Sequence, residues 1–390
     1  MAALRLAAAC CLMALLASAA NAQTTRAADS PTGAVVTADK RISGKIAIKD
    51  GKLQVGQQTL EWSDVLMLTV NRKIEASQAV RLSDGQLLAC RVLSMKNGSC
   101  SVHSFLLGKH SLDVKQLAAI EFQSDLSWSP TGDAGVLQRW EAEPVPGTVQ
   151  WIDDRHLAID SPLGTLTLDR NGLRKYVFDL PRKAAASAPA TAPADEIVLS
   201  DGSLLRAEVS LAGTDLQVRH AALGQAKLPA TVVAGFVRKG KVALLDDLQP
   251  KFEAKPLLGK GDKAENRPAA GLQFVAGPDG NLLFQRAVVV EPQGKLVYAL
   301  DKLAGARAGS ELRLIAHLRM SDESKAGVRV IIRADEKVVF DKEIQPAGGE
   351  DVAVGLGRAR QLSVEVEFGK VMKFPCRLVI GEGLLVPAAE

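Results

Sequence analysis

The sequence predicts an all-β protein in which tandem small β-barrel or β-sheet repeat units precede a β-sandwich. In residues 325–344, β-branched side chains recur with a period of two, which is the period of a strand. Residues 334–337, of which the last three are charged, interrupt this run and predict the turn of a hairpin. Residues 361–368 alternate almost as strictly, and the best helical candidate, 133–143, is short.

The N-terminal segment has the features of a secretory signal peptide. Arg5 supplies the positive charge, residues 6–16 form an apolar run, and Ala20-Asn21-Ala22 is an A-x-A cleavage site. The apolar run is too short to span a bilayer, so we expect a protein that is not membrane-spanning. The sequence therefore predicts cleavage near Ala22 and a secreted, periplasmic or cell-envelope location.

The central part of the chain repeats itself. Residues 80–88 recur as residues 197–205, and each copy contains an Asp-Gly pair, at Asp84-Gly85 and at Asp201-Gly202. Aspartate followed by glycine favours a turn with a positive φ, so a hairpin is expected in both copies. A weaker similarity between the segments that begin near 42 and 145 raises the number of units to four. Units of this length bury their apolar faces by packing on one another.

Repeats and composition together divide the chain into segments. The expected order is a signal peptide at 1–22, a loose leader at 23–40, a β-repeat pair at 41–122, a second pair at 144–237, a linker at 238–270 and the sandwich at 271–388. An Ala/Pro-rich linker at 183–194 lies inside the second pair. Whether the units form separate barrels or one compound sheet stays open.

Charge and cysteine content limit the classes of partner. The chain has 48 Lys and Arg against 44 Asp and Glu, a balance that gives no basis for nucleic-acid binding. Cys90, Cys100 and Cys376 remain after the signal peptide, so at most one intrachain disulfide forms. One hypothesis joins Cys90 to Cys100, although a hairpin at Asn97-Gly98 places them on opposite faces unless a bulge intervenes. The alternative is three small buried thiols.

No motif in the sequence predicts catalysis, a metal site or a cofactor. The chain contains no P-loop, H-E-x-x-H, C-x-x-C or G-x-S-x-G motif, and its histidines are scattered. His103 and His220 occupy near-equivalent repeat positions, which predicts a shared place on a strand face. We therefore expect a protein that is not an enzyme.

Several C-terminal segments together resemble a known family of secreted bacterial modules. They come in the order 296–300, 314–318, 338–341, 362–369 and 376–380. In this order they resemble the NPCBM family of carbohydrate-binding modules, over roughly residues 272–386. The resemblance implies a galactose-binding-like jelly-roll sandwich and recognition of glycan by its loops.

The function predicted from the sequence is therefore non-catalytic recognition at the cell envelope or outside the cell. The expected partner is a glycan or an envelope protein, and the alternative is a structural scaffold whose sandwich has lost ligand binding. Weak candidates for sugar contact are the charged turn residues Asp322, Glu323, Asp335 and Lys337. Most aromatic residues of the sandwich lie in apolar strand runs, which predicts core positions and no stacking platform.

Overall fold

The computed structural model describes residues 31–72, 78–123, 133–179, 194–254, 269–277, 280–303 and 310–388. The predicted signal peptide and the Ala/Pro linker lie outside these residues, apart from Ala194. In the described part of the chain, every regular element is a β-strand or a one-turn 3-10 helix. The all-β prediction is confirmed. No helix in this part is long and apolar enough to cross a membrane.

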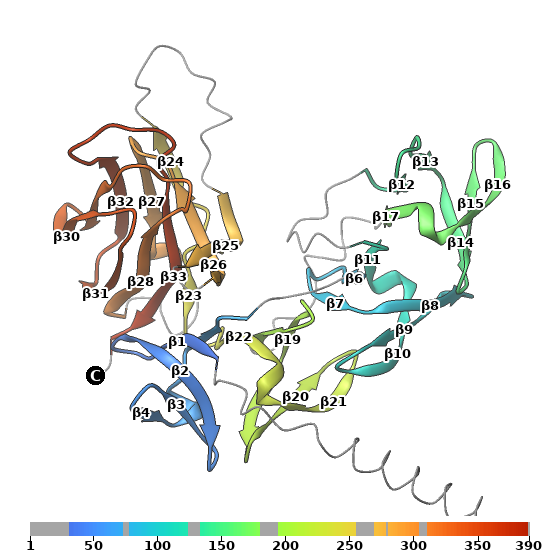
Figure 1. The fold of residues 1–390 in the computed structure, drawn as a ribbon, viewed down its shortest axis with the longest axis horizontal. Coiled ribbons are helices and arrows are strands. Elements are labelled where there is room, and N and C mark those ends of the chain that lie inside the picture. The colour runs from blue at the N-terminus through green and yellow to red at the C-terminus, as the bar shows by residue number, and fades with distance from the viewer. Residues whose placement is uncertain are drawn as a thin grey trace, which may run out of the picture. The chain divides into compact units, whose positions relative to one another are not determined.

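Four repeat units share one order of elements, namely a three-stranded ribbon, a 3-10 turn and a closing strand (Figure 1). Unit 1 consists of β2 (Arg41–Lys49), β3 (Lys52–Val55), β4 (Gln58–Leu60), η1 (Trp62–Asp64) and β5 (Met67–Val70). Unit 2 consists of β8 (Arg91–Lys96), β9 (Ser99–Ser104), β10 (Gly108–Asp113), η2 (Val114–Gln116) and β11 (Leu117–Glu121). Unit 3 consists of β14 (Thr148–Ile152), β15 (His156–Ser161), β16 (Gly164–Asp169), η3 (Arg170–Gly172) and β17 (Leu173–Val177). Unit 4 consists of β19 (Leu204–Ala212), β20 (Asp215–His220), β21 (Gly224–Pro229), η5 (Ala230–Val232) and β22 (Val233–Val237).

Additional strands lead into the units. They are β1 (Thr32–Val36), β6 (Ala79–Leu82), β7 (Leu87–Ala89), β12 (Val136–Arg139), β13 (Val145–Pro146) and β18 (Asp195–Leu199). Strand β1 lies within the segment 23–40 that the sequence predicted to be a loose leader. Its residues Val35 and Val36 are buried, and it pairs with both β2 and β5. The leader prediction was therefore wrong for this strand, because its apolar residues complete the core of unit 1.

The units associate in a nested order that differs from the predicted pairs, which placed units 1 and 2 together in 41–122 and units 3 and 4 together in 144–237. Closing strand β5 pairs with β22, so unit 1 joins unit 4. Closing strand β11 pairs with β17, so unit 2 joins unit 3. Each closing strand has a second closing strand on one edge and a leading strand on the other: β1 beside β5, β18 beside β22, β6 beside β11 and β12 beside β17.

The two Asp-Gly hairpins meet each other at the centre of this arrangement. Leu87 of β7 lies directly opposite Leu204 of β19, which is the equivalent residue of the other copy. The backbone N–H of Ala89 donates to Ser203 Oγ at 3.0 Å, and that of Arg206 donates to Gln86 Oε1 at 2.5 Å. These two hydrogen bonds are equivalent, so the copies are related by a local two-fold pseudo-symmetry.

Both Asp-Gly pairs form the expected turns. The φ angles of Gly85 and Gly202 are 89° and 90°. Asp84 Oδ1 accepts a hydrogen bond from the Gln86 N–H at 3.1 Å, and Asp201 Oδ1 accepts one from Ser203 N–H at 2.9 Å. The aspartates therefore act as turn formers.

Replacing Gly85 with Val should lower the free energy of unfolding by about 1 kcal/mol or more, because a β-branched side chain is strained at this φ. A Cβ at Gly85 would have no atom within 4 Å, so the expected loss comes from the backbone alone. Chemical denaturation measures it. Gly355→Val is the matched control, because Gly355 also has open space but lies in a strand, where valine is favoured. An equal loss in both variants would contradict the expectation.

His103 and His220 do not share a strand face, contrary to the prediction. The sequence repeat aligns His103 with His220. In the structure, His103 pairs with Arg91, and the equivalent pair in unit 4 is Arg219 with Glu208, so His103 matches Arg219, one residue before His220. A β-bulge between Val92 and Ser94 accompanies this shift of one residue. Because a shift of one residue moves a side chain to the opposite face, His103 is exposed whereas His220 is buried.

The three cysteines of the described chain are buried free thiols. Cys100 lies opposite Met95, as predicted from the hairpin register, and no disulfide joins it to Cys90. Burial raises the pKa of Cys90 and of Cys100 to about 12, which keeps both thiols protonated at neutral pH.

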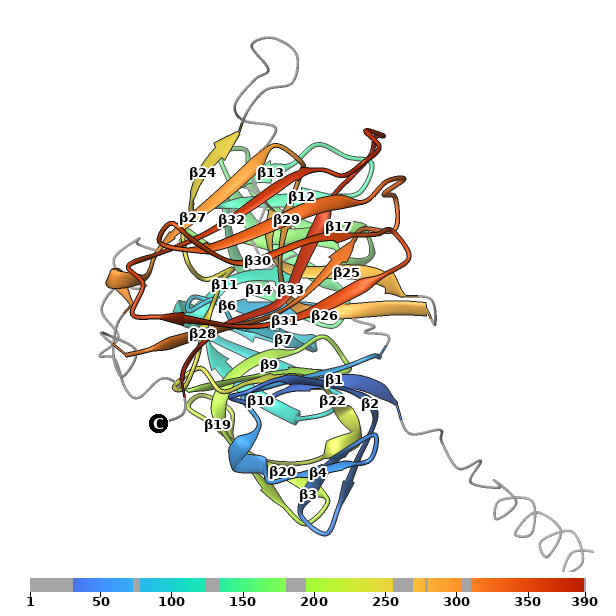
Figure 2. The ribbon, with the colours of Figure 1, turned by 90° about the vertical axis from the view of Figure 1, so that its left-hand side faces the viewer.

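The C-terminal part is a sandwich of two antiparallel sheets. One sheet has the order β25 (Ala269–Gly277), β26 (Gly280–Val290), β33 (Leu378–Pro387), β28 (Leu312–Met320) and β31 (Gly349–Gly357), with β23 (Ala243–Leu244) also paired to β33. The other has the order β24 (Lys251–Ala254), β27 (Gly294–Ala299), β32 (Gln361–Phe368), β29 (Val328–Ala334) and β30 (Lys337–Ile344), and Figure 2 shows these strands side by side. Tyr298 is 1% exposed between the sheets, as predicted. Strands β23 and β24 belong to the sandwich although the sequence placed them in the linker 238–270.

A buried cluster of charges joins unit 4 to the sandwich. Arg286 of β26 contacts Glu196 of β18 (Nε to Oε1, 3.2 Å) and Asp246 (Nη1 to Oδ2, 3.1 Å). The side chains of Glu196 and Asp246 are 0% and 2% exposed. Lys239 contacts Glu196 at 3.5 Å and also pairs with Asp247. Buried carboxylates are tolerated only with such partners, so the cluster fixes how these elements meet.

Candidate functional site

Four loops gather at one end of the sandwich because of the strand registers. Val328, the first residue of β29, lies opposite Ile344, the last of β30, and Phe368, the last of β32. Gly294, the first residue of β27, lies opposite Val366. The loops that adjoin these strand ends, namely 291–293, 321–327, 345–348 and 369–377, form what we term the loop rim.

Two of these loops are fixed to each other by backbone hydrogen bonds. The N–H of Ser321 donates to Arg377 O at 2.9 Å, and that of Lys325 donates to Pro375 O at 3.1 Å. The N–H of Gly369 donates to Gly327 O at 3.2 Å. Cys376 points inward, where its buried Sγ donates to Ala326 O at 3.2 Å. The loop 369–377 therefore has a defined conformation.

This fixed loop presents apolar side chains to solvent. Val371 is 52% exposed, Met372 57% and Phe374 61%. The ring of Phe374 packs edge-on against Phe368, with 5.3 Å between centroids and an interplanar angle of 77°. The sequence predicted a core position for Phe374, but its side chain is exposed. Cys376 is the buried residue of this segment, and the hydrogen bonds to the loop 321–327 keep Phe374 at the surface. The sandwich thus has an exposed aromatic ring that the sequence did not predict.

Hydrogen-bonding side chains lie on the same rim. Arg377 contacts Glu291 (Nε to Oε1, 3.2 Å) and Glu323 (Nη1 to Oε2, 3.8 Å). Asp322 pairs with Arg319 at 3.4 Å. The candidates Asp322 and Glu323 therefore lie on the loop rim. Sequence reasoning did not identify Phe374, Arg377 or Glu291 as candidates. The one available signal was the segment Phe374-Pro-Cys-Arg377, in which an aromatic residue directly precedes a proline.

The candidates Asp335 and Lys337 lie elsewhere. They follow β29, whereas Asp322 and Glu323 precede it, and a strand of seven residues rises about 20 Å. Asp335 has a φ of 52°, and its Oδ1 accepts hydrogen bonds from the N–H groups of Arg360 and Gln361, both at 3.0 Å. Asp335 therefore has a structural role in the β29–β30 turn. The four candidates do not form one site.

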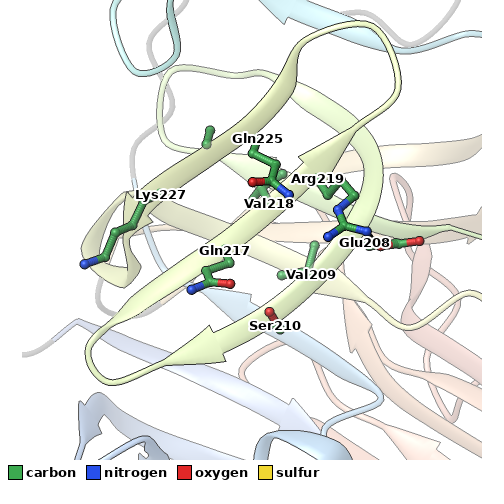
Figure 3. A pocket seen from close by; sticks show the side chains of 9 residues that line it. Glu208, Val209, Ser210, Gln217, Val218, Arg219, Gln225 and Lys227 are labelled. Carbon is green, nitrogen blue, oxygen red and sulfur yellow. Dashed lines mark ion pairs between the residues drawn. The ribbon is translucent and has the colours of Figure 1, made fainter.

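A second surface of interest is the polar hollow on the ribbon β19–β21 of unit 4, shown in Figure 3. Its volume is about 410 Å³, and two rows of three polar side chains cross it: Glu208, Arg219 and Gln225, then Ser210, Gln217 and Lys227. Arg219 pairs with Glu208 at 3.5 Å. No aromatic residue lines the hollow, so it offers hydrogen bonds without a stacking surface.

Two tryptophans of the repeat units are also partly exposed. Trp140 is 45% exposed and Trp151 36%. The guanidinium of Arg174 lies 5.1 Å from the centre of the Trp140 ring, so one face of this ring already has a cation–π partner. Phe105 in the β9–β10 turn is 90% exposed as well, so exposed aromatic rings occur in both parts of the chain. Among them, Phe374 lies on a loop that backbone hydrogen bonds join to a neighbouring loop.

Titratable groups in the described residues do not converge on a reactive centre. No group of three or more His, Cys, Asp or Glu in the described ranges could hold a metal ion. His220 contacts Gln86 (Nε2 to Oε1, 2.8 Å), and burial lowers its pKa, so its neutral ring serves the joint between the repeats. His317 contacts Asp351 at 2.7 Å beside Arg41.

Comparisons with known proteins give only distant similarities. No family model matches the chain, and no curated protein matches it. A CBM51 module from Clostridium perfringens GH95, in complex with methyl-galactose, is 15% identical over 37% of this chain and 99% of that one, with a TM-score of 0.31. The tandem CBM51 modules of the family 98 glycoside hydrolase from Streptococcus pneumoniae are 11% identical over 76% of this chain and all of that one, with a TM-score of 0.32. Such low TM-scores do not establish a shared fold, so the NPCBM resemblance stays a prediction.

Proposed function

We propose that this protein is an exported, non-catalytic recognition protein that binds glycan through the loop rim of its sandwich. The observation that carries the proposal is the exposed ring of Phe374 on a loop that hydrogen bonds hold in place. A protein pays conformational entropy when it orders a loop on binding, and a fixed loop avoids this cost. Exposed apolar side chains on such a loop are typical of a binding surface.

The rim supplies the two kinds of contact that a sugar needs. The apolar face of a pyranose ring can pack on Phe374, whose inner edge is held by Phe368. Arg377, Glu291 and Glu323 offer donors and acceptors for hydroxyl groups. Each exchanged hydrogen bond contributes about 1 kcal/mol net. We therefore expect weak binding, with a Kd of about 0.1–1 mM, or roughly −4 to −5.5 kcal/mol.

Replacing Phe374 with Ala should weaken glycan binding about fivefold or more, because the stacked ring contributes about 1 kcal/mol. Calorimetry of the full chain against a polysaccharide panel measures this loss. Phe105→Ala is the control, because Phe105 is 90% exposed but lies in a hairpin tip of unit 2. Equal affinities of the two variants for the best ligand would contradict a site at the rim.

The alternative is a scaffold that binds protein, and one feature favours it. Strand β30 ends the order of its sheet among the described strands, and it exposes Val338 by 47%. An unpaired strand edge can add a strand from another chain. A dimer in analytical ultracentrifugation that Val338→Lys disrupts, together with no glycan binding, would support this alternative.

A further inference from the structure

We infer that the glycan bound at the loop rim is anionic, such as a polysaccharide that carries carboxylate or sulfate groups. This inference rests on the proposed function and adds the chemical class of the ligand. It follows from an imbalance between the acidic and basic side chains of the rim. Its carboxylates are engaged within the protein, whereas three of its lysines are not.

The carboxylates at this end of the sandwich have partners. Glu291 and Glu323 both contact the guanidinium of Arg377. Asp322 pairs with Arg319, and Glu343 Oε1 accepts a hydrogen bond from the Lys370 N–H at 3.3 Å. These four carboxylates are thus engaged by two arginines and one neutral N–H, and with the three lysines described next the charges at this end sum to about +1 (five cations against four anions).

The lysines of the same two loops have no such partner. Lys325, Lys370 and Lys373 are exposed, and none of them forms an ion pair with a described residue. Lys325 lies beside Pro375, to which its N–H donates, and Lys373 directly precedes Phe374. Three ammonium groups thus accompany the exposed ring on loops that are bonded to each other.

This combination of groups favours a repeating anion over a neutral sugar. A flexible lysine is a mobile point charge that does not require one fixed anion geometry. A polymer with regularly spaced anionic groups can meet several lysines while one of its rings packs on Phe374. Because exposed charges are screened by salt, the resulting affinity should fall as ionic strength rises.

The test compares an acidic and a neutral polysaccharide on the full chain, with polygalacturonate and galactan as probes. Calorimetry at low and at high salt gives the affinities. The test variant carries Lys325→Gln, Lys370→Gln and Lys373→Gln. The control variant carries Lys49→Gln, Lys96→Gln and Lys109→Gln, which removes the same charge from exposed positions in units 1 and 2. We expect the test variant to lose about tenfold in affinity for polygalacturonate and the control variant to lose little.

Each outcome has a distinct meaning. Tighter binding of polygalacturonate that depends on the three rim lysines supports the inference. Binding of galactan that is as tight, and equal in both variants, overturns the anionic class and leaves the proposed function intact. Binding of neither polysaccharide by the unaltered chain, alongside binding to vesicles of anionic lipid, would overturn the inference in favour of a lipid surface. Binding of no probe at all would overturn the inference and count against the proposed function.

Discussion

Replacing Arg286 with Met should lower the free energy of unfolding by about 3–5 kcal/mol. The variant leaves Glu196 and Asp246 without the guanidinium that contacts both of them. Methionine fills similar space, so the loss comes mainly from two carboxylates that stay buried with less compensation. Lys239 still contacts Glu196, but a single ammonium group cannot bridge two carboxylates in the way that a planar guanidinium does.

The measurement is equilibrium denaturation of the full chain. Arg329→Met is the matched control, because Arg329 also contacts two carboxylates, Asp341 at 2.7 Å and Glu367 at 3.4 Å, but on the exposed face of β29. An exposed ion pair contributes about 1 kcal/mol or less, so the control should lose little. Similar losses in the two variants would show that the Arg286 cluster is solvated in solution.

The second large effect concerns pH and Asp246. Burial raises the pKa of Asp246 from 3.8 to about 6, and the nearby Asp247 and Glu196 act in the same direction against Arg286 and Lys239. Between these two values the native protein holds a proton that the unfolded chain releases. Stability contributed by this group therefore falls as the pH rises from about 4 to 6, by roughly 3 kcal/mol in total.

Asp246→Asn removes this titration, so its stability relative to the unaltered protein should increase as the pH rises through the same window. Denaturation midpoints between pH 4 and pH 7 measure the difference.

Asp351→Asn should behave in the opposite way. Burial tends to raise the pKa of Asp351, but the hydrogen bond from His317 and the charge of Arg41 lower it overall. The Asp351 variant should therefore lose stability across the range above pH 4 and regain it relative to the unaltered protein only as the pH falls below about 4, which requires midpoints at lower pH. A constant difference for Asp246→Asn across the range would contradict the raised pKa.

The strands could be predicted from the sequence because their signals are local. Alternation in 361–368 depends only on neighbouring residues, and it became β32. The turns at Asp84-Gly85 and Asp201-Gly202 follow from the backbone freedom of two residues. The pairing of the units could not be predicted, because β5 finds β22 through contacts between distant apolar residues. A bulge of one residue was enough to separate His103 from His220.

The candidate site was predictable only in part, for a similar reason. Turn polarity correctly placed Asp322 and Glu323 in a loop, and the same signal in Asp335 led to a structural turn. The exposure of Phe374 depends on hydrogen bonds between the loops 321–327 and 369–377, which lie far apart in the sequence. Hydropathy predicts that a phenylalanine is buried. The exposure of Phe374 therefore could not be predicted from the residue type, since it results from contacts between distant loops.

The nested association of the repeat units affects when the chain can fold during its synthesis. Met67 at the start of β5 pairs with Val237 at the end of β22, so the ribosome must add all of units 2 to 4 before unit 1 gains its neighbour. Units 2 and 3 are adjacent in the sequence and can dock first. Contacts between distant residues slow folding, since a long loop has to be closed before they form. Strand β1 can cover one edge of β5 early, but the other edge stays unpaired until residues 233–237 emerge, which is the interval in which a chaperone would have a strand edge to bind.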